Sequence, residues 1–405
     1  MGLFRTTRPA PAPASAEPAG GGDFPYLAAS DIYLDAACQS LRPQPVLDAM
    51  TAYFTEYGAC GERGKYAWGR RVDEDVDAVR AATIAAFGLP ARRYTCAFTL
   101  NTTMGLGLLL QQLPASRYAR VVTTHHEHNS VFLSTMTAAR RLGVPRELID
   151  RAPDGTVDLG GADLTDALVV VSAMDNVTGT LTQNLAALVA DVQRRGGAVI
   201  IDAAQAAPHA LGALHGIAAD ALCFSAHKMY GPSLGVVVAA NTLLERLELS
   251  FIGGGQVADV TADGFTLSSD LHTRLEPGLQ AWAEIIGFGA ALRWFLPQRA
   301  AVEQREARLA QRLFDALAEM PHLRVLNAAA SATISAIPER VDAHRLAVFL
   351  SKAGIMVRSG HFCAHHWLHE QEQLPALVRF SLGAHTTDAD LERAIEVTSG
   401  LMRGL

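Results

Sequence analysis

Short apolar runs alternate with longer amphipathic stretches through the middle of the chain. The apolar runs have the length and composition of buried strands, which we expect at residues 94–100, 120–124, 168–173, 198–202, 221–225 and 235–239. Between them, apolar residues at helical spacing predict helices at 104–113, 131–142 and 185–195. Strands that alternate with helices are typical of βαβ units, in which a mostly parallel sheet carries helices on both faces. The pattern therefore predicts an α/β fold whose ligand site lies at the carboxyl ends of the strands.

A different pattern begins near residue 280. Two long helices are expected at 281–296 and 302–318, before a smaller α+β region. In that region we expect strands at 333–337, 355–358 and 377–382, and helices at 342–353 and from 388 onward. Residues 1–22 are rich in Ala, Pro and Gly and have little to bury. The expected organisation is therefore a flexible tail (1–22), a large domain (23–280) and a small C-terminal α+β domain (281–405).

Composition and charge narrow the classes of function. Hydrophobic residues make up 49% of the chain and charged residues 19%, as in a globular protein. A formal net charge of -7 argues against nucleic acid as the main partner, because phosphates require an excess of Lys and Arg. No apolar run approaches the ~20 residues that span a bilayer, so no membrane segment is expected. The five cysteines lack CxxC spacing, which favours neither a zinc site nor disulfides; a reducing, cytoplasmic compartment is expected.

The strongest chemical signal lies at two successive strand ends. Asp202 ends one buried strand, and a buried carboxylate is costly unless a cation faces it. The next strand ends in Ser225, His227 and Lys228. A protonated pyridine ring would pair with Asp202, its aldehyde would bond to Lys228, and Ser225 and His227 would reach a phosphate. Either strand end alone is more often an ordinary helix cap or a polar surface loop, because polar residues are common where strands end. Together they favour a pyridoxal-phosphate site.

These two segments read Asp-Ala-Ala-Gln at 202–205 and Ser-x-His-Lys-x-Tyr-Gly-Pro at 225–232. They resemble the signature of fold-type I pyridoxal-phosphate enzymes of aminotransferase class V, in the cysteine desulfurase and selenocysteine lyase branch. The resemblance covers nearly the whole chain. It implies pyridoxal 5'-phosphate as the cofactor, held covalently by Lys228, and a homodimer with active sites near the interface. It also implies that Gln205 bonds the phenolic oxygen of the cofactor and that Asn176 lies near that oxygen and the substrate carboxylate.

Two further segments extend the resemblance. The turn at Thr102 and Thr103, between a strand and a helix, resembles the phosphate loop of the family, and free amides at a helix N-terminus bind anions. A plain capping turn is the alternative interpretation. Glu127 and His128 match the family's Glu-His pair, which implies that His128 stacks on the pyridine ring and takes part in proton transfer. The neighbouring histidines lack the spacing of zinc ligands, so no metal site is expected.

The C-terminal motif indicates the subclass. Residues 358–364 resemble the desulfurase segment Arg-x-Gly-His-x-Cys-Ala, in which the cysteine accepts sulfur. Cys363 follows Arg358 and His361, which favour a reactive thiolate and are expected to contact the substrate. The alternative is a buried, inert cysteine. Arg379 lies in an Arg-x-Ser-Leu segment like that of the family, where the arginine binds the substrate carboxylate. We expect Cys38, Cys96 and Cys223 to be inert, because each lies in an apolar or strand-like context.

The sequence departs from the family pattern at two places. Leu279 replaces the threonine that would reach the phosphate in the neighbouring subunit. Downstream of Cys363, the family's usual run is replaced by three histidines and a tryptophan, which we interpret as a tuned substrate pocket: His365, His366, Trp367 and His369.

The expected reaction is cleavage of the C–S or C–Se bond of L-cysteine or a related sulfur or selenium amino acid, with sulfur transfer to Cys363 and release of alanine. A sulfur-acceptor protein is a further expected partner. A pyruvate-forming C–S β-lyase, an epimerase and an aminotransferase of the same fold remain alternatives. A silent scaffold or sulfur-carrier partner is the non-enzymatic alternative, and the complete set of Lys228, Asp202, Gln205 and His227 argues against it.

Overall fold

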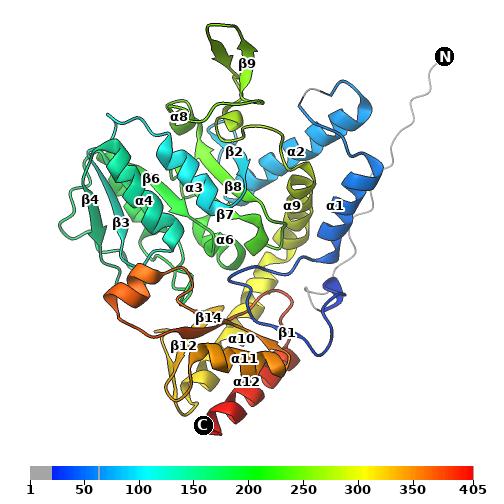
Figure 1. The fold of residues 1–405 in the computed structure, drawn as a ribbon, viewed down its shortest axis with the longest axis vertical. Coiled ribbons are helices and arrows are strands. Elements are labelled where there is room, and N and C mark those ends of the chain that lie inside the picture. Colours follow the sequence, from blue (N-terminus) through cyan, green and yellow to red (C-terminus); the bar gives the residue numbers. More distant parts are fainter. Residues whose placement is uncertain (1–20, 63, 405) are drawn as a thin grey trace.

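The computed structural model describes residues 21–62 and 64–404 (Figure 1). The expected tail at 1–22 therefore lies almost wholly outside the described residues. In Figure 1 a larger α/β body lies above a smaller one, and the chain ends in the smaller body at the C-terminus of α12 (Asp388–Arg403).

A seven-stranded sheet forms the centre of the larger body. Its order is β2-β8-β7-β6-β5-β3-β4, and β8 alone in this sheet runs antiparallel to its neighbours. The strands are β2 (Tyr94–Thr99), β3 (Arg120–Thr124), β4 (Arg146–Ile149), β5 (Ala167–Ser172), β6 (Ala198–Asp202), β7 (Ala221–Ser225) and β8 (Gly235–Ala240). The six expected strands and the mostly parallel α/β fold are confirmed. The edge strand β4 was not expected, because its charged residues interrupt the apolar pattern.

Both faces of the sheet are buried, which is why its strands are apolar at nearly every position. In β5, Val169 and Val171 belong to one apolar cluster, and Leu168 and Val170 belong to the other, because side chains alternate between faces. The first face is covered by α2 (Ala67–Ala86), α5 (Leu185–Arg194) and α9 (Trp282–Phe295). The second is covered by α3 (Thr102–Gln111) and α4 (Asn129–Leu142).

The smaller body is an antiparallel sheet of order β11-β12-β15-β14 with helices packed on it. Its strands are β11 (Leu323–Val325), β12 (Thr333–Pro338), β14 (Arg358–Gly360) and β15 (Leu377–Ser381). The helices are α10 (Arg299–Ala318), α11 (Ala343–Lys352) and α12. They share an apolar cluster with β1 (Ile32–Tyr33), which pairs with β13 (Ile355–Met356). Packing does not follow the expected boundary at residue 280. Helix α9, after this boundary, packs in the apolar core of the larger body, and β1, before it, packs in the core of the smaller body.

The remaining elements lie around this framework. Helix α1 (Gln44–Glu56) packs against α9, and the short helices α6 (Ala206–His209), α7 (Leu211–Leu214) and α8 (Asn241–Leu244) follow strands of the central sheet. A hairpin of β9 (Val257–Val260) and β10 (Phe265–Leu267) projects from the larger body (Figure 1). None of the helices among the described residues is long and apolar enough to cross a bilayer.

Candidate active site

A cavity of about 290 Å³ lies where the strands of the central sheet end and the smaller body begins. The structure brings almost all the expected site residues to its walls. Those that line it are Thr102, Thr103, His128, Asn176, Asp202, Gln205, Ser225, His227, Lys228, Arg358, Cys363 and Arg379. The parallel strands place these residues together, because their carboxyl ends share one edge of the sheet.

The charged centre of the cavity is formed by Asp202 and Lys228. Asp202 is the last residue of β6, is 5% exposed, and accepts a hydrogen bond from the backbone N–H of Ala204 at 2.9 Å. Burial raises the pKa of this carboxyl group, and the Lys228 ammonium opposes that shift. Lys228 ends the 3₁₀ turn after β7, where burial lowers its pKa and Asp202 acts in the opposite direction. A lysine whose pKa is lowered by burial, beside a carboxylate that stabilises its ammonium form, suits a role as nucleophile and base.

The polar wall at the start of α3 is built from hydroxyl groups. Asn101 caps the helix by accepting from the Met104 N–H at 2.9 Å. The Thr102 N–H donates to Ser225 Oγ at 2.9 Å, and the hydroxyl groups of Thr103 and Ser130 lie 2.6 Å apart. Hydroxyl groups at a helix N-terminus form a site for an anion such as a phosphate.

Buried polar atoms indicate that a ligand belongs in this cavity. Gln205 donates from Nε2 to the Ala37 carbonyl at 2.8 Å, while its Oε1 is buried and has no hydrogen-bond partner among the described residues. Such an atom is costly unless a ligand satisfies it. Asp202 is likewise buried, and Lys228 is the cation that favours its charged form. A cationic ring that carries a hydroxyl group and a phosphate fits Asp202, Gln205 and the α3 wall together.

Histidines near the cavity are held neutral. His128 caps α4 by accepting from the Ser130 N–H at Nδ1, 3.0 Å away, so its proton lies on Nε2. Burial, with Lys228 and Arg379 nearby, lowers the pKa of His128 to about 3. Burial and Lys228 similarly lower the pKa of His227 to about 4. Both rings are therefore uncharged at neutral pH and suit stacking or neutral hydrogen bonding.

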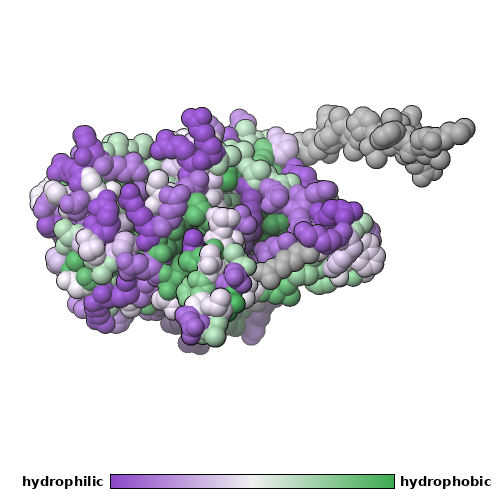
Figure 2. All heavy atoms as spheres, turned by 90° about the horizontal axis from the view of Figure 1, so that it is seen from above, coloured by the Kyte–Doolittle hydropathy of each residue, from purple (hydrophilic) through white to green (hydrophobic). Residues whose placement is uncertain are grey.

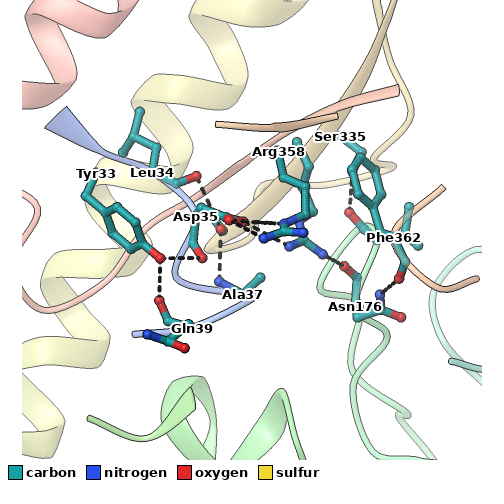
Figure 3. Close-up of polar contacts among 12 residues, drawn as sticks. Tyr33, Leu34, Asp35, Ala37, Gln39, Asn176, Ser335, Arg358 and Phe362 are labelled. Carbon is teal, nitrogen blue, oxygen red and sulfur yellow. Dashed lines mark hydrogen bonds and ion pairs between the residues drawn. The ribbon is translucent and has the colours of Figure 1, made fainter. Parts of the chain in front are cut away.

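Two arginines form the far wall of the cavity. Arg379, on β15, is 2% exposed and donates to the Asn176 carbonyl at 2.8 Å and to Asp35 Oδ1 at 3.2 Å. Arg358, on β14, donates to both oxygens of Asp35 at 2.9–3.1 Å. Figure 3 shows the Asp35 carboxylate facing the guanidinium group of Arg358, with Asn176 beyond it. Arg379 also lies over the ring of Phe362, 4.7 Å from its centroid.

Cys363 lies on a turn that is conformationally strained. Phe362 and Cys363 have φ angles of 50° and 58°, a left-handed conformation that non-glycine residues adopt at a cost of about 1–2 kcal/mol each. Asn176 Nδ2 donates to the Phe362 carbonyl at 2.6 Å, and the Asn129 N–H donates to the Cys363 carbonyl at 2.6 Å. These bonds hold an exposed thiol against the cavity wall.

The structure does not bring His361 into this cavity. Its Nε2 lies 3.2 Å from the Leu374 carbonyl, and its ring packs near those of His365 and His369. His361 and His369 line a separate surface hollow. Phe362 and Cys363 have positive φ angles and turn the chain after His361, so His361 and Cys363 point to different surroundings.

The aromatic run after Cys363 does not line the cavity either. His366 lies 3.0 Å from His125 and stacks on Phe132, and Trp367 stacks on His126 with ring centroids 4.4 Å apart. The expectation that this run tunes the pocket is therefore not supported by its position. These rings instead fasten the segment His366–Gln371 to the end of β3.

Sequence reasoning misjudged one residue that lines the cavity and overlooked an acidic residue that pairs with two of its arginines. Cys38, which we expected to be inert, lines the cavity, whereas Cys96 and Cys223 are buried in the sheet with raised pKa values. Asp35 was not singled out, although an acidic residue immediately after a short apolar strand is the same signal that identified Asp202.

Comparisons with known proteins agree with this site. The model of the aminotransferase class-V family matches residues 32–394. A cysteine desulfurase of Klebsiella pneumoniae is 30% identical over 387 residues, which are 92% of this chain and 93% of that protein. The solved apo structure of cysteine desulfurase from Thermococcus onnurineus is 28% identical, with a TM-score of 0.84 over 93% of this chain and 95% of that one.

A second solved structure, an Escherichia coli cysteine desulfurase in an S-sulfonic acid form, is 25% identical with a TM-score of 0.86, and the match covers 95% of this chain and 98% of that one. The family match spans both bodies of the fold and every residue that lines the cavity. This chain belongs to the aminotransferase class-V family of pyridoxal-phosphate enzymes, in its cysteine desulfurase-like branch.

Proposed function

We propose that this protein is a pyridoxal-phosphate-dependent cysteine desulfurase. It would cleave the C–S or C–Se bond of L-cysteine or a related amino acid, transfer the sulfur or selenium to Cys363 and release alanine. The observation that carries the proposal is the position of Cys363, an exposed thiol on a strained turn that lines the same cavity as Lys228 and Asp202. A cysteine kept only for packing would be buried, as Cys96 and Cys223 are.

The cavity residues would divide the cofactor between them. Asp202 would face the ring nitrogen, Lys228 would bond to the aldehyde, and Gln205 would meet the ring oxygen. The phosphate would lie against the hydroxyl groups and the start of α3, contacted by Thr102, Thr103, Ser225 and His227. The neutral ring of His128 would stack on the cofactor. When bound, the cofactor supplies an electron sink for the charge that develops at the substrate Cα.

The substrate would be held and attacked by residues of this chain. Arg379 would bind the α-carboxylate, with Asn176 beside it, since a guanidinium group matches a carboxylate in two-point geometry. Lys228, whose pKa is lowered by burial, would remove the Cα proton. The Cys363 thiolate would attack the substrate sulfur, and the C–S bond would break. The sulfur would stay on Cys363 as a persulfide, and the electron pair of the broken bond and one proton would end on Cβ. Return of the proton from Lys228 to Cα would then give alanine.

Assembly into a homodimer is part of the proposal. Figure 2 views the molecule from above and shows apolar surface in the middle of that face. Several large apolar side chains of the chain are more than half exposed, and four of them lie in or next to the hairpin and neighbouring loops: Phe251, Val260, Phe265 and Leu279. Exposed apolar patches of this kind are typical of interfaces. We further propose a cytoplasmic location and a sulfur-acceptor protein that discharges Cys363.

The test is Cys363→Ala in the cofactor-loaded protein, assayed with L-cysteine for alanine, pyruvate and sulfide together. The expected result is loss of alanine formation by at least about 100-fold, because no thiol remains to take the sulfur, with the cofactor spectrum unchanged. Mass spectrometry of the wild type after brief exposure to L-cysteine should find one added sulfur on Cys363. The control is Cys60→Ala, which removes another exposed thiol. Pyruvate formation that survives in Cys363→Ala would show a β-lyase and overturn the proposal.

A further inference from the structure

The pairing of β14 with β15 creates an electrostatic conflict. Its register sets Arg358 directly opposite Arg379, so two guanidinium groups project from adjacent positions of one sheet. Like charges directly opposite each other on paired strands repel, and this effect is larger where one of them is buried. The Arg379 side chain is 3% exposed and the Arg358 side chain is 43% exposed. A carboxylate is therefore needed between them.

Asp35 supplies that carboxylate from a distant part of the chain. It follows β1 and forms an isolated parallel bridge with Ser381, next to β15. Its side chain is 13% exposed and bonds Arg358 through three contacts of 2.9–3.1 Å and Arg379 through one of 3.2 Å. The three groups together carry one net positive charge. That charge matches one substrate carboxylate and leaves none for a second.

We propose that Asp35 is a specificity-determining residue that restricts the site to amino acids with an uncharged side chain. The inference rests on the proposed function in one respect, namely that an amino acid occupies this cavity with its α-carboxylate on Arg379. The substrate side chain must then extend toward Cys363, and Arg358 lines the cavity on the same wall. Asp35 neutralises Arg358 there and repels an acidic side chain. Without Asp35, Arg358 would become a free partner for a second acid.

The experiment compares L-aspartate with L-asparagine, which have nearly the same shape and differ in one charge. Their dissociation constants are measured by calorimetry on the cofactor-loaded protein, in the wild type and in Asp35→Asn. Asp35→Asn also changes the surroundings of Arg379, which would bind the α-carboxylate. Both ligands carry this group, so its effect on binding cancels in the ratio of the two dissociation constants. We expect Asp35→Asn to shift the ratio toward L-aspartate by about tenfold or more, as removal of one nearby negative charge requires. Neither ligand contains sulfur, so the result does not depend on desulfurase activity.

Two further variants make the outcome decisive. Asp31→Asn removes the same charge from the other end of β1. It should leave the ratio within about twofold of the wild type, because the ion pairs of Arg358 and Arg379 are made by Asp35. Arg358→Gln keeps Asp35 but removes its main partner, so it should shift the ratio against L-aspartate even if Asp35→Asn does not fold. An unchanged ratio in Asp35→Asn, an equal shift in Asp31→Asn, or a shift toward L-aspartate in Arg358→Gln would overturn the proposal.

Discussion

At the scale of single residues, burial shifts the pKa values of titratable groups that line the cavity or lie beside it. The pKa of His128 is lowered to about 3, and the pKa of His126 and of His227 to about 4, with burial as the largest cause in each. Glu127, 1% exposed, has its pKa raised to about 7 by burial, against the opposing effect of Arg151. The histidines are therefore neutral and fixed before the cofactor binds. Binding of a charged cofactor then requires little reorientation of these groups.

These histidines predict a dependence of stability on pH. Below the ordinary histidine pKa of about 6.5, the unfolded chain gains a proton on His128 that the folded protein does not accept until near pH 3. The free energy of unfolding should therefore fall as pH is lowered from 7 to 4. His128→Gln should reduce that fall by about 1–2 kcal/mol, measured by urea unfolding of the cofactor-free protein at several pH values. An equal reduction in His215→Gln, at an exposed position, would contradict this explanation.

At the scale of elements, the turn after β14 shows how a reactive side chain is placed. Three of the four residues from Gly360 to Cys363 have positive φ angles, which no regular strand or helix contains: Gly360, Phe362 and Cys363. Two hydrogen bonds from the larger body hold its carbonyl groups. The position of Cys363 thus depends on contacts between the two bodies and not on its own sequence.

This arrangement predicts that Asn176→Ala loosens the turn. Loss of the bond to the Phe362 carbonyl should lower protection of the Ala364 amide, which donates to His361 within the turn, by about tenfold in hydrogen exchange. The matched control is Asn129→Ala, because Asn129 contacts the Cys363 carbonyl through its backbone and should keep that bond. Protection that is unchanged in Asn176→Ala would mean that the turn is held by other contacts.

At the scale of the whole molecule, the proposed dimer would bury the exposed apolar side chains of the hairpin and its neighbouring loop. Phe265 is 53% exposed on β10, and Leu279 is 76% exposed beside Gly278, whose N–H donates to Gly254 at 2.6 Å. If a second copy of the chain covers these residues, an aspartate introduced at either position would lose its hydration when the dimer forms, at a cost of several kcal/mol. The sequence resemblance implies that Leu279 replaces a threonine directed at the cofactor phosphate of a neighbouring subunit, which is consistent with its place in the proposed interface.

We therefore expect the double variant Phe265→Asp, Leu279→Asp to sediment as a monomer at micromolar concentration, where the wild type sediments as a dimer. The control is Val348→Asp on α11, which is 53% exposed in the smaller body and should remain dimeric. Sedimentation velocity distinguishes the two species. A wild type that is monomeric and fully active would exclude the dimer, whereas a dimeric double variant would place the interface elsewhere.

The sequence by itself determined the central sheet and the core of the cofactor site. Its strands are buried on both faces, so their apolar runs are visible without any knowledge of packing. Asp202 and Lys228 follow two such strands that are adjacent in sequence and in the sheet, so parallel pairing alone brings them together. Local pattern was sufficient because the interacting residues lie on neighbouring elements.

Only the tertiary structure decided which residues complete the substrate end of the cavity. Asp35 meets Arg358 across 323 positions of the chain and Arg379 across 344, through the pairing of β1 with the smaller body. His361 lies two residues from Cys363 yet faces another hollow, because positive φ angles turn the chain between them. The spacing of apolar residues in the sequence predicts neither the Asp35 contacts nor the orientation of His361. Both depend on how distant segments pack and on the direction of a strained turn.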